Sequence, residues 1–424
     1  MQSTASSSRD FDVVVVGAGT AGVVAAMAAA STGARTCLID SSGYLGGTTF
    51  ALGNVVSFHN NRMKRVVAGF PQAIVDRALS RGGAVGDGHV PNPGGMCGTV
   101  TLLDSSILNQ VTFEIMEELS IELMLHSIMT DVHVEGTRVT GITVANKAGT
   151  QEITARCFVD SSGDADLAIK AGAEHEKDQP GKGSLSATTV YRVGKVDHEQ
   201  LVADLKRHPH RVILLEDPFL AREYGTTPDK IMASKVKTIY DLPYIYLSNI
   251  VRDYIPEKDW SLWGITGIEK SQWGKLNPFG SRVHLSASPL SPEIVYVNTT
   301  NMHFDATDPV AISHAESEGQ RQVHLSLEML KRYVPGFKDS TLIGSMPRTT
   351  PRASRRIMGN YQVTREDVEL GHRFEDSIAK GCYPMSVQSL TNVNVRLHLY
   401  VENGGDYDIP YRSLVPQTVD GVVV

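Results

Sequence analysis

The sequence has few cysteines, and no two of them stand close enough to form a known metal or redox motif. The four cysteines among 424 residues are Cys37, Cys97, Cys157 and Cys382, without a CxxC pair. This spacing argues against a zinc knuckle, an internal iron–sulfur cluster or a disulfide framework. The cysteine content therefore predicts a reducing, cytoplasmic compartment.

A basic excess is also missing. The formal net charge is -7, with 47 acidic against 40 basic residues, and no basic stripe interrupts the sequence. Nucleic-acid binding requires such an excess or stripe, so we expect no nucleic-acid partner. Hydrophobic residues make up 41% and charged residues 21%, as in soluble globular enzymes. The length exceeds what one hydrophobic core supports and predicts two or three domains.

Targeting and membrane segments are not evident either. The opening MQSTASSSRD is polar and lacks the apolar core of a signal peptide, so we expect residues 1–10 to form a disordered tail. The uncharged run Val13–Ala30 has the length of a membrane span. Its glycines stand where a strand turns into a helix, which favours a buried strand–turn–helix and predicts no membrane span.

The first forty residues have the pattern of a βαβ unit. The β-branched run at 11–16 predicts a buried strand, the glycine-rich turn at 17–22 follows, and small residues at 21–32 predict a tightly packed helix. A second strand is expected at 35–40. Further along, we expect a helix at 104–119 with Asp104 or Ser105 as N-cap, a helix at 308–333, and strands at 121–126, 131–135, 138–146, 152–159, 188–192 and 294–299.

Gly17, Gly19 and Gly22 have the spacing of a dinucleotide-binding turn. The first glycine permits the tight turn, the second lets backbone N–H groups approach a pyrophosphate, and the third allows close helix–sheet packing. Asp40 ends the second strand, where a carboxylate suits the ribose hydroxyls of an adenosine. A glycine-rich turn without ligand is the structural alternative, and the surrounding strand, helix and carboxylate favour dinucleotide binding.

Two later segments favour FAD over NAD. A Gly-Gly segment, SSGYLGGTT, occupies 41–49, and FVDSSGDADLA at 158–168 ends an apolar strand in an acidic, glycine-bearing turn. Together with the glycine turn they resemble FAD-dependent oxidoreductases of the glutathione-reductase and p-hydroxybenzoate-hydroxylase type, in which these motifs recur in this order. The resemblance covers essentially the whole chain, and segments 350–368 and 408–424 are similar to a large bacterial group within that family.

The resemblance implies an α/β fold, in which a Rossmann-like FAD-binding domain carries an inserted α+β substrate domain. The FAD-binding domain would comprise 11–57, 100–178 and 405–424, and the substrate or cap domain 58–99 and 179–404. By similarity, the residues that hold FAD would be Gly17, Gly19, Thr20, Ala21, Gly22 and Asp40 for the ADP half, Gly46, Gly47 and Thr48 for the pyrophosphate and flavin side, Val132 near the adenine, and Ser162, Gly163 and Asp164 near the pyrophosphate.

The sequence departs from the family pattern at two places. Asp40 stands where a longer Glu is commoner, which puts its reach to the ribose in doubt. The family continues after its last strand with a glycine-rich turn and a helix that contacts the flavin, whereas this sequence ends at Val424. The resemblance then implies either a shortened sequence or a flavin held less firmly than in the family.

Catalysis on a flavin needs a substrate carbon near the ring and usually a proton acceptor beside it. His59, just after the Gly-Gly segment, and His303, after a strand of the expected substrate domain, are candidates, although a structural histidine is the favoured alternative for each. The group Arg352, Arg355 and Arg356 suits a clamp for a substrate carboxylate or cofactor phosphate. Surface ion pairs with Glu366, Asp367 or Glu369 remain the open alternative.

Other reactive residue types favour structural roles. Tyr383 is interpreted as a packed aromatic rather than a hydrogen-bond donor to a ligand. Cys97 and Cys382 lie beside glycines, yet without a CxxC partner they favour inert thiols over redox thiols. The run KRHPHR at 206–211 predicts a solvated turn rather than a metal or anion site, and we predict no metal site elsewhere.

The resulting prediction is a FAD-dependent oxidoreductase, a dehydrogenase, oxidase or reductase that transfers a hydride between a small organic substrate and flavin. One alternative is a FAD- and NAD(P)H-dependent aromatic monooxygenase on the same fold, for which no NADPH-binding feature stands out. Another is a flavin-bearing electron-transfer subunit of a larger complex, which would be expected to carry iron–sulfur cysteine clusters or a partner subunit. The sequence is compatible with a homo-oligomer.

Overall fold

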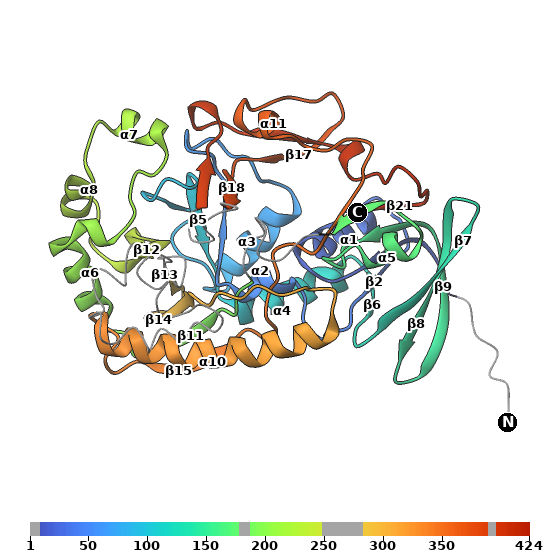
Figure 1. Ribbon diagram of the computed structural model, residues 1–424, viewed down its shortest axis with the longest axis horizontal. Helices are drawn as coiled ribbons and strands as arrows, with labels where there is room; N and C mark the ends of the chain where they lie inside the picture. The colour runs from blue at the N-terminus through green and yellow to red at the C-terminus, as the bar shows by residue number, and fades with distance from the viewer. Residues whose placement is uncertain (1–8, 178–186, 248–282, 389–395) are drawn as a thin grey trace.

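The computed structural model describes residues 9–177, 187–247, 283–388 and 396–424 (Figure 1). Residues 1–8 of the expected tail lie outside this part of the chain. The described residues build two main sheets with separate hydrophobic cores, one beside the cofactor motifs and one in the middle of the sequence. The fold is therefore α/β, with a parallel and antiparallel central sheet.

The first sheet has seven strands in the order β6-β2-β1-β9-β8-β7, and β21 pairs with β9 beside this path. Four strand pairs are parallel: β1 with β2, β1 with β9, β2 with β6 and β9 with β21. The strands β7, β8 and β9 form an antiparallel meander. The strands are β1 (Arg9–Val16), β2 (Thr36–Ile39), β6 (Glu122–Met124), β7 (Ile128–Glu135), β8 (Arg138–Asn146), β9 (Gly149–Asp160) and β21 (Val422–Val423). Valines 14 to 16 of β1 are all buried, because helices and strands cover both faces of this parallel part.

Helices α1 (Thr20–Ser31), α3 (Phe70–Ser80) and α4 (Ser105–Glu118) pack together against one face of this sheet. Asp104 caps α4, since its carboxylate accepts hydrogen bonds from the N–H groups of Ser106 and Ile107 at 3.0 Å. Two short helices, α2 (Gly47–Ala51) and α5 (Asp166–Lys170), follow the Gly-Gly segment and β9. The sequence reasoning placed 58–99 in the substrate domain, but α3 shares its core with α1 and α4.

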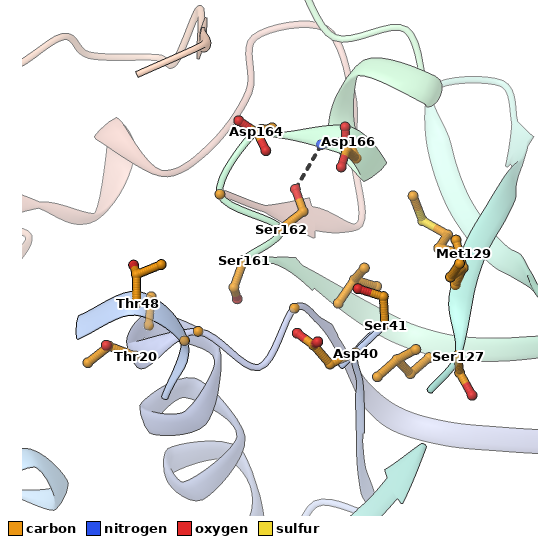
Figure 2. A pocket seen from close by; sticks show the side chains of 18 of the residues that line it. Thr20, Asp40, Ser41, Thr48, Ser127, Met129, Ser161, Ser162, Asp164 and Asp166 are labelled. Atoms are coloured by element: carbon orange, nitrogen blue, oxygen red, sulfur yellow. Dashed lines mark hydrogen bonds between the residues drawn. The ribbon is translucent and has the colours of Figure 1, made fainter. Parts of the chain in front are cut away.

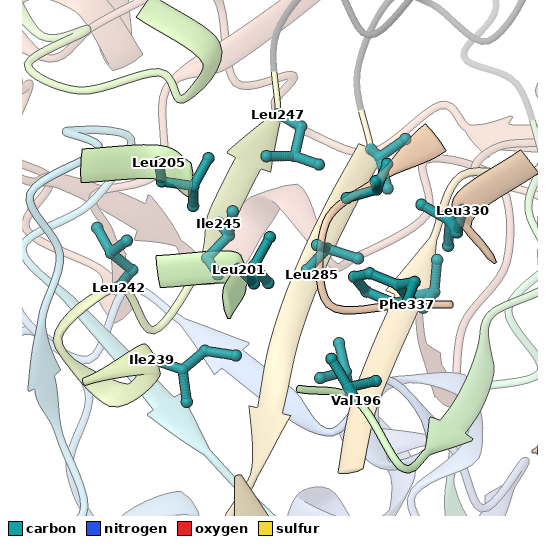
Figure 3. Close-up of a cluster of buried hydrophobic side chains, with 14 of the residues drawn as sticks. Val196, Leu201, Leu205, Ile239, Leu242, Ile245, Leu247, Leu285, Leu330 and Phe337 are labelled. Atoms are coloured by element: carbon teal, nitrogen blue, oxygen red, sulfur yellow. The ribbon is translucent and has the colours of Figure 1, made fainter. Parts of the chain in front are cut away.

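The second sheet has the order β12-β13-β14-β11-β15 and is antiparallel throughout. Its strands are β11 (Tyr191–Gly194), β12 (Ile245–Leu247), β13 (Val283–Ser288), β14 (Ser291–Asn298) and β15 (Thr341–Ser345). Alternate residues of these strands enter a large apolar cluster with the long helix α10 (Pro309–Tyr333), α6 (His198–Arg207) and α8 (Pro228–Ser234) (Figure 3). In Figure 1, α10 runs along the lower edge of the molecule. One face of the second sheet thus packs into the apolar core, and the side chains of the other face point away from this core.

Smaller elements connect the two sheets. A three-stranded sheet is formed by β3 (Asn54–Val56), β5 (Thr99–Leu102) and β4 (Val90–Pro91), and β10 (His175–Lys177) pairs with β16 (Arg355–Ile357). The remaining elements are β17 (Ser377–Gly381) paired with β20 (Tyr407–Pro410), β18 (Met385–Gln388) paired with β19 (Arg396–Leu399), α7 (Pro218–Tyr224), α11 (Arg365–Glu369), η1 (Pro209–Arg211), η2 (Ile239–Asp241), η5 (Glu402–Gly404) and η6 (Tyr411–Ser413). No helix within the described ranges combines the length and apolar character that a bilayer crossing requires.

The expected βαβ opening, the helices at 104–119 and 308–333 and the strands at 131–135, 138–146 and 152–159 are confirmed, with ends shifted by a few residues. The strand expected at 121–126 is β6, which does not join these antiparallel strands but pairs in parallel with β2. The expected strands at 188–192 and 294–299 correspond to β11 and β14, which pair with each other. The exact division into two domains stays a prediction.

A core prediction follows from Phe337, which has no exposed surface inside the second core. Replacement of Phe337 by Ala removes a whole ring from a closed cluster, so we expect a loss of about 3–5 kcal/mol in the free energy of unfolding. Denaturant unfolding followed by circular dichroism measures it. The matched control is Leu342→Ala in β15, whose side chain is 48% exposed and whose loss should cost under about 0.5 kcal/mol. Equal effects of the two changes would contradict this picture of the core.

Candidate functional site

A cavity of about 690 Å³ opens at the carboxyl ends of β1, β2 and β9. Val16, Ile39 and Ser161 lie on its wall, each at or just after the end of one of these strands. In open α/β sheets ligands bind at this edge, because the loops that follow neighbouring parallel strands meet there. We call this cavity the strand-end pocket; Figure 2 shows it from close by.

The glycine turn between β1 and α1 supplies one wall by bringing backbone close to backbone. A Cβ built on Gly17, at φ +102, would lie 2.3 Å from the carbonyl oxygen of Ser161, and one on Gly22 would lie 1.9 Å from that of Gly17. A Cβ on Gly19 would meet no atom closer than 4.0 Å. Gly17 and Gly22 therefore serve the packing of the turn, whereas Gly19 leaves open space on the pocket wall.

The Gly-Gly segment is fastened to this turn. Gly46 donates its N–H to Ala18 O at 2.8 Å, and Thr20 Oγ1 donates to Gly46 O at 3.0 Å. The ideal Cβ position of Gly47, at φ +56, lies 3.1 Å from Gly19 Cα, so a side chain would crowd the contact. The two glycine motifs, separated in sequence by the whole of α1 and β2, thus form one continuous backbone surface.

Asp40 shapes the turn as well as facing the pocket. Its Oδ2 accepts the N–H of Ala18 at 2.6 Å, and its Oδ1 accepts the N–H and hydroxyl of Ser42, both at 2.7 Å. A carboxylate offers about four lone-pair sites, so these three bonds leave about one for a ligand. The shorter Asp is thus held against the glycine turn, and it retains limited capacity for a ribose hydroxyl.

The turn after β9 supplies the opposite wall. Asp160, 4% exposed, accepts from the Ser162 hydroxyl at 2.7 Å and from the Ala168 N–H at 2.9 Å, which closes the turn into α5. Ser162 Oγ in turn accepts the N–H of Asp166 at 2.9 Å (Figure 2). Ser161 Oγ is buried on the pocket wall and has no hydrogen-bond partner among the described residues. A buried hydroxyl without a partner is unfavourable and indicates a site for a ligand atom or water.

A distant segment holds this turn in place. The Ser354 hydroxyl donates to Asp164, while Arg355 donates through Nε to Asp164 O at 2.7 Å and forms an ion pair with Asp166. Burial raises the pKa of Asp164, and the Ser354 hydroxyl and the positive charges of Arg355 and Arg348 act in the opposite direction. We call Ser354 and Arg355 the strap, because they tie the segment around β16 to the pocket loop.

The pocket also contains two cationic side chains. Lys170, at the end of α5, and Arg348, in the loop after β15, are exposed and lie on its wall. Asp40, Asp164 and Asp166 are the acidic residues of the wall. The pocket therefore offers positive charge on the side of α5 and Arg348, together with the N-terminal N–H groups of α1, which lack a side-chain cap.

The structure places most of the predicted cofactor residues on this wall. The lining residues among them are Gly17, Gly19, Thr20, Ala21, Asp40, Gly46, Gly47, Thr48, Ser162, Gly163 and Asp164. Gly22 lies beneath the turn, and Val132 packs toward the core of the meander instead. Near the expected adenine side the wall consists of Ser127, Ile128 and Met129, at the start of β7.

The predicted catalytic residues lie elsewhere. His59 hydrogen-bonds Thr99 through Nδ1 at 3.1 Å and packs against His89, and burial, followed by the charge of Arg65, lowers its pKa. His303 and Arg352 are exposed. None of these three lines the strand-end pocket, and Arg355 reaches its loop only as part of the strap. Their catalytic roles stay predictions.

The other reactive candidates are buried or paired. Burial raises the pKa of Cys97 to about 11 and that of Cys382 to about 12, which disfavours thiolate formation. In the 206–211 run, Arg211 forms an ion pair with the buried Asp204 at 2.8 Å. In the arginine segment, Arg355 pairs with Asp166, and Glu369 pairs with Arg365. Whether Arg352 and Arg356 act as an anion clamp or in surface ion pairs stays a prediction.

Several residues that line the strand-end pocket were not predicted from the sequence. They are Ser41, Ser127, Ile128, Met129, Ser161, Asp166, Lys170 and Arg348. Ser161 and Asp166 could have been predicted, since both lie in the segment 158–168 that resembles the family motif. The turn before β7 was also visible between two expected strands. Arg348 could not be predicted from any local pattern, because only the tertiary fold brings the loop after β15 to the pocket.

Comparison with known proteins agrees with this geometry. A family model described as FAD dependent oxidoreductase matches residues 12–424. A 3-oxosteroid 1-dehydrogenase from Mycobacterium tuberculosis (strain ATCC 25618 / H37Rv) is 42% identical over 67 residues, so the match spans 15% of this chain and 12% of that protein.

Solved structures align with most of this chain at low sequence identity. A geranylgeranyl bacteriochlorophyll reductase-like protein from Thermoplasma acidophilum is 13% identical, with 84% of this chain and 68% of that chain covered and a TM-score of 0.45. For p-nitrophenol 4-monooxygenase from Pseudomonas putida DLL-E4 the identity is 13%, the coverage 84% and 71%, and the TM-score 0.45. Likeness at this level says nothing about the reaction.

The glycine turn gives a test of the pocket. Gly19→Val places a branched side chain in the open space of the wall without a backbone clash, so we expect cofactor content to fall at least about tenfold while the fold persists. Flavin absorbance and circular dichroism of the purified variant measure both. Gly22→Ala is the contrasting change, because its Cβ would press on Gly17 O and should lower stability itself. Normal flavin content in Gly19→Val would show that the turn is only structural.

The strap gives a second test. Arg355→Gln removes the ion pair to Asp166 and the charge that holds the pocket loop, so we expect a several-fold faster loss of cofactor on dilution. Arg365→Gln, which breaks an exposed pair in the same segment, is the control and should have almost no effect. Flavin fluorescence recovery after dilution follows the release. If both variants release cofactor at the same rate, the strap does not support the pocket.

Proposed function

The chain belongs to the family of FAD-dependent oxidoreductases, and from this premise we propose that it transfers a hydride between a small organic substrate and FAD held in the strand-end pocket. The proposal rests on one observation above all. Three loops after parallel strands converge on a single cavity, and each carries a motif suited to one part of a dinucleotide.

The residues at the middle of the pocket fit a pyrophosphate. The first turn of α1 presents N–H groups without a side-chain cap, which makes this end of the helix suited to an anion. Gly19 leaves room for close approach, and Ser161, whose buried hydroxyl has no partner among the described residues, lines the same pocket. Lys170 and Arg348 supply the positive charge that the two phosphates need.

The two ends of the pocket fit the two halves of FAD. We assign the adenosine to the side of Asp40, Ser41 and Met129, where Asp40 keeps one acceptor site for a ribose hydroxyl. The flavin side is assigned to Gly46, Gly47 and Thr48, where the backbone is free of bulky side chains. The absence of side chains there permits the flat ring to lie close to the main chain.

FAD, when bound, supplies the acceptor and donor of the hydride. The protein then has to hold the dinucleotide, orient the substrate and keep water away from the reacting atoms. The pocket loops perform the first task. The second sheet is suited to the others, because its face that does not enter the core is turned toward α2 and the N-terminus of α4, where Val190, Tyr296 and Met346 pack with Ala51 and Leu52.

The cofactor assignment has a direct test. We expect the purified protein to absorb near about 370 and 450 nm, as flavins do, and to release FAD rather than FMN on denaturation. Asp40 and the glycine turn suit an ADP moiety, which FMN lacks. Chromatography of the released cofactor distinguishes the two. Release of FMN, or of NAD without flavin, would overturn the assignment to this pocket.

The reaction has its own test. Under anaerobic conditions a substrate that donates a hydride should bleach the 450 nm band, and a compound that accepts one should restore it after chemical reduction. Arg365→Gln, remote from the pocket wall, serves as the activity control. A protein that holds FAD but exchanges electrons only with a partner flavoprotein or an iron–sulfur protein would contradict hydride transfer with a small molecule.

A further inference from the structure

The face of the second sheet that does not enter its core carries polar side chains next to the apolar Val190 and Met346. In register across three strands, Arg192 of β11 is opposite Tyr296 of β14, and Tyr296 is opposite Ser286 of β13. Their neighbours along each strand, such as Tyr191 and Val295, enter the apolar core. Strand alternation therefore places a guanidinium and two hydroxyls together on the outer face.

A second cavity of about 150 Å³ lies on this face, above Arg192. Residues of both halves of the fold line it: Tyr44, Ala51, Ser105, Ser106, Val190, Tyr191, Arg192, Gly344, Ser345, Met346 and Pro347. Gly344 is opposite Arg192 on β15, and a Cβ built on it would meet no atom within 4 Å. The glycine leaves space beside the guanidinium.

Arg192 differs from the other arginines discussed above in the groups that surround its guanidinium. Its Nη1 lies 3.4 Å from Ser105 Oγ, and its guanidinium lies 5.8 Å from the centre of the Tyr296 ring. Among the described residues no carboxylate comes within ion-pair distance of it, unlike Arg355, Arg211 and Arg365. The neighbouring Asp104 accepts hydrogen bonds from the N–H groups of Ser106 and Ile107 as the N-cap of α4.

The hydroxyl side chains of Tyr44, Ser105, Ser106 and Ser345 also line the cavity. Tyr44 donates to Ser105 O at 3.2 Å, and burial raises its pKa to about 12, so its phenol stays neutral. The Ser105 hydroxyl oxygen lies 3.3 Å from that of Tyr296, which is not part of the cavity wall, so the Ser105 hydroxyl can bond Tyr296 or turn toward a ligand. An arginine without a carboxylate partner among hydroxyl groups suits an oxyanion, since its planar fork matches a carboxylate.

The cavity adjoins the flavin side of the strand-end pocket. Thr48 lines the strand-end pocket and Ala51, three residues later on the same helix, lines the Arg192 cavity, a rise of about 4.5 Å. On the facing segment, Pro347 lines one cavity and Arg348 the other. A molecule in the Arg192 cavity is thus a neighbour of whatever lies along Gly46, Gly47 and Thr48.

From this placement we propose that the Arg192 cavity is the substrate site and that the substrate is a small organic acid whose carboxylate Arg192 binds. This inference rests on the proposed function, which it makes more specific. A cavity of this size holds a molecule on the order of six non-hydrogen atoms. The anion clamp that the sequence suggested at Arg352 and Arg355 is assigned instead to Arg192, because Arg355 is already paired with Asp166.

The test compares isosteric probes that differ in charge. Calorimetric titration of the full-length protein with lactate and with lactamide should show lactate bound at least about tenfold more tightly. Arg192→Gln should remove this preference. Arg192→Lys should retain only part of it, because the charge stays and the fork is lost. Arg207→Gln, an exposed arginine on α6, is the matched control and should bind both probes as the unmodified protein does.

A second variant separates binding from folding. Gly344→Val fills the space beside Arg192 and leaves the arginine in place, so lactate binding should fall at least about tenfold with unchanged circular dichroism. Equal binding of lactate and lactamide, no binding of either, or an unchanged preference in Arg192→Gln would each overturn the proposal. The FAD content is recorded in parallel, because a protein without FAD would refute the proposed function, whereas normal FAD with no dependence on Arg192 would refute only the substrate site.

Discussion

The parallel pairing of β1 with β9 is the constraint on which the rest of the site depends. It sets the turn after β1 against the turn after β9, although well over a hundred residues separate them in sequence. The approach is so close that only glycine fits at position 17, where a Cβ would lie 2.3 Å from Ser161 O. Both turns then line one pocket, with the helix start on one wall and the Ser161 hydroxyl on the other.

Further contacts make this arrangement rigid. Asp40 binds Ala18, Gly46 binds the same turn, and Asp160 closes the turn after β9 from below. Ser354 and Arg355 add support from a segment that follows the second sheet. Because these bonds are made by protein groups alone, the pocket is preorganised, and a dinucleotide that binds there meets backbone already in position.

The two cavities use different kinds of chemistry. The strand-end pocket presents mainly backbone, small side chains and the end of a helix, which suit phosphates and ribose. The cavity at Arg192 presents a guanidinium and hydroxyls from the outer face of a sheet whose inner face is a closed apolar core. In the proposed function, the second sheet would determine which substrate binds, and the strand-end pocket would hold the cofactor.

The sequence by itself determined the βαβ opening, the meander and most of the pocket wall, because these features depend on local signals. Valine runs, glycine spacing and the N-cap residue Asp104 are patterns within a few neighbouring residues, so they can be recognised without the tertiary structure. The tertiary structure alone decided the partners of Arg355, the packing of Val132 against a core cluster and the position of Arg348. The position of Arg192 was also decided by the tertiary structure, since nothing in the sequence distinguishes it from other strand residues. Its role depends on strand register, on the missing side chain of Gly344 and on the approach of α2, and these contacts join residues that no local pattern connects.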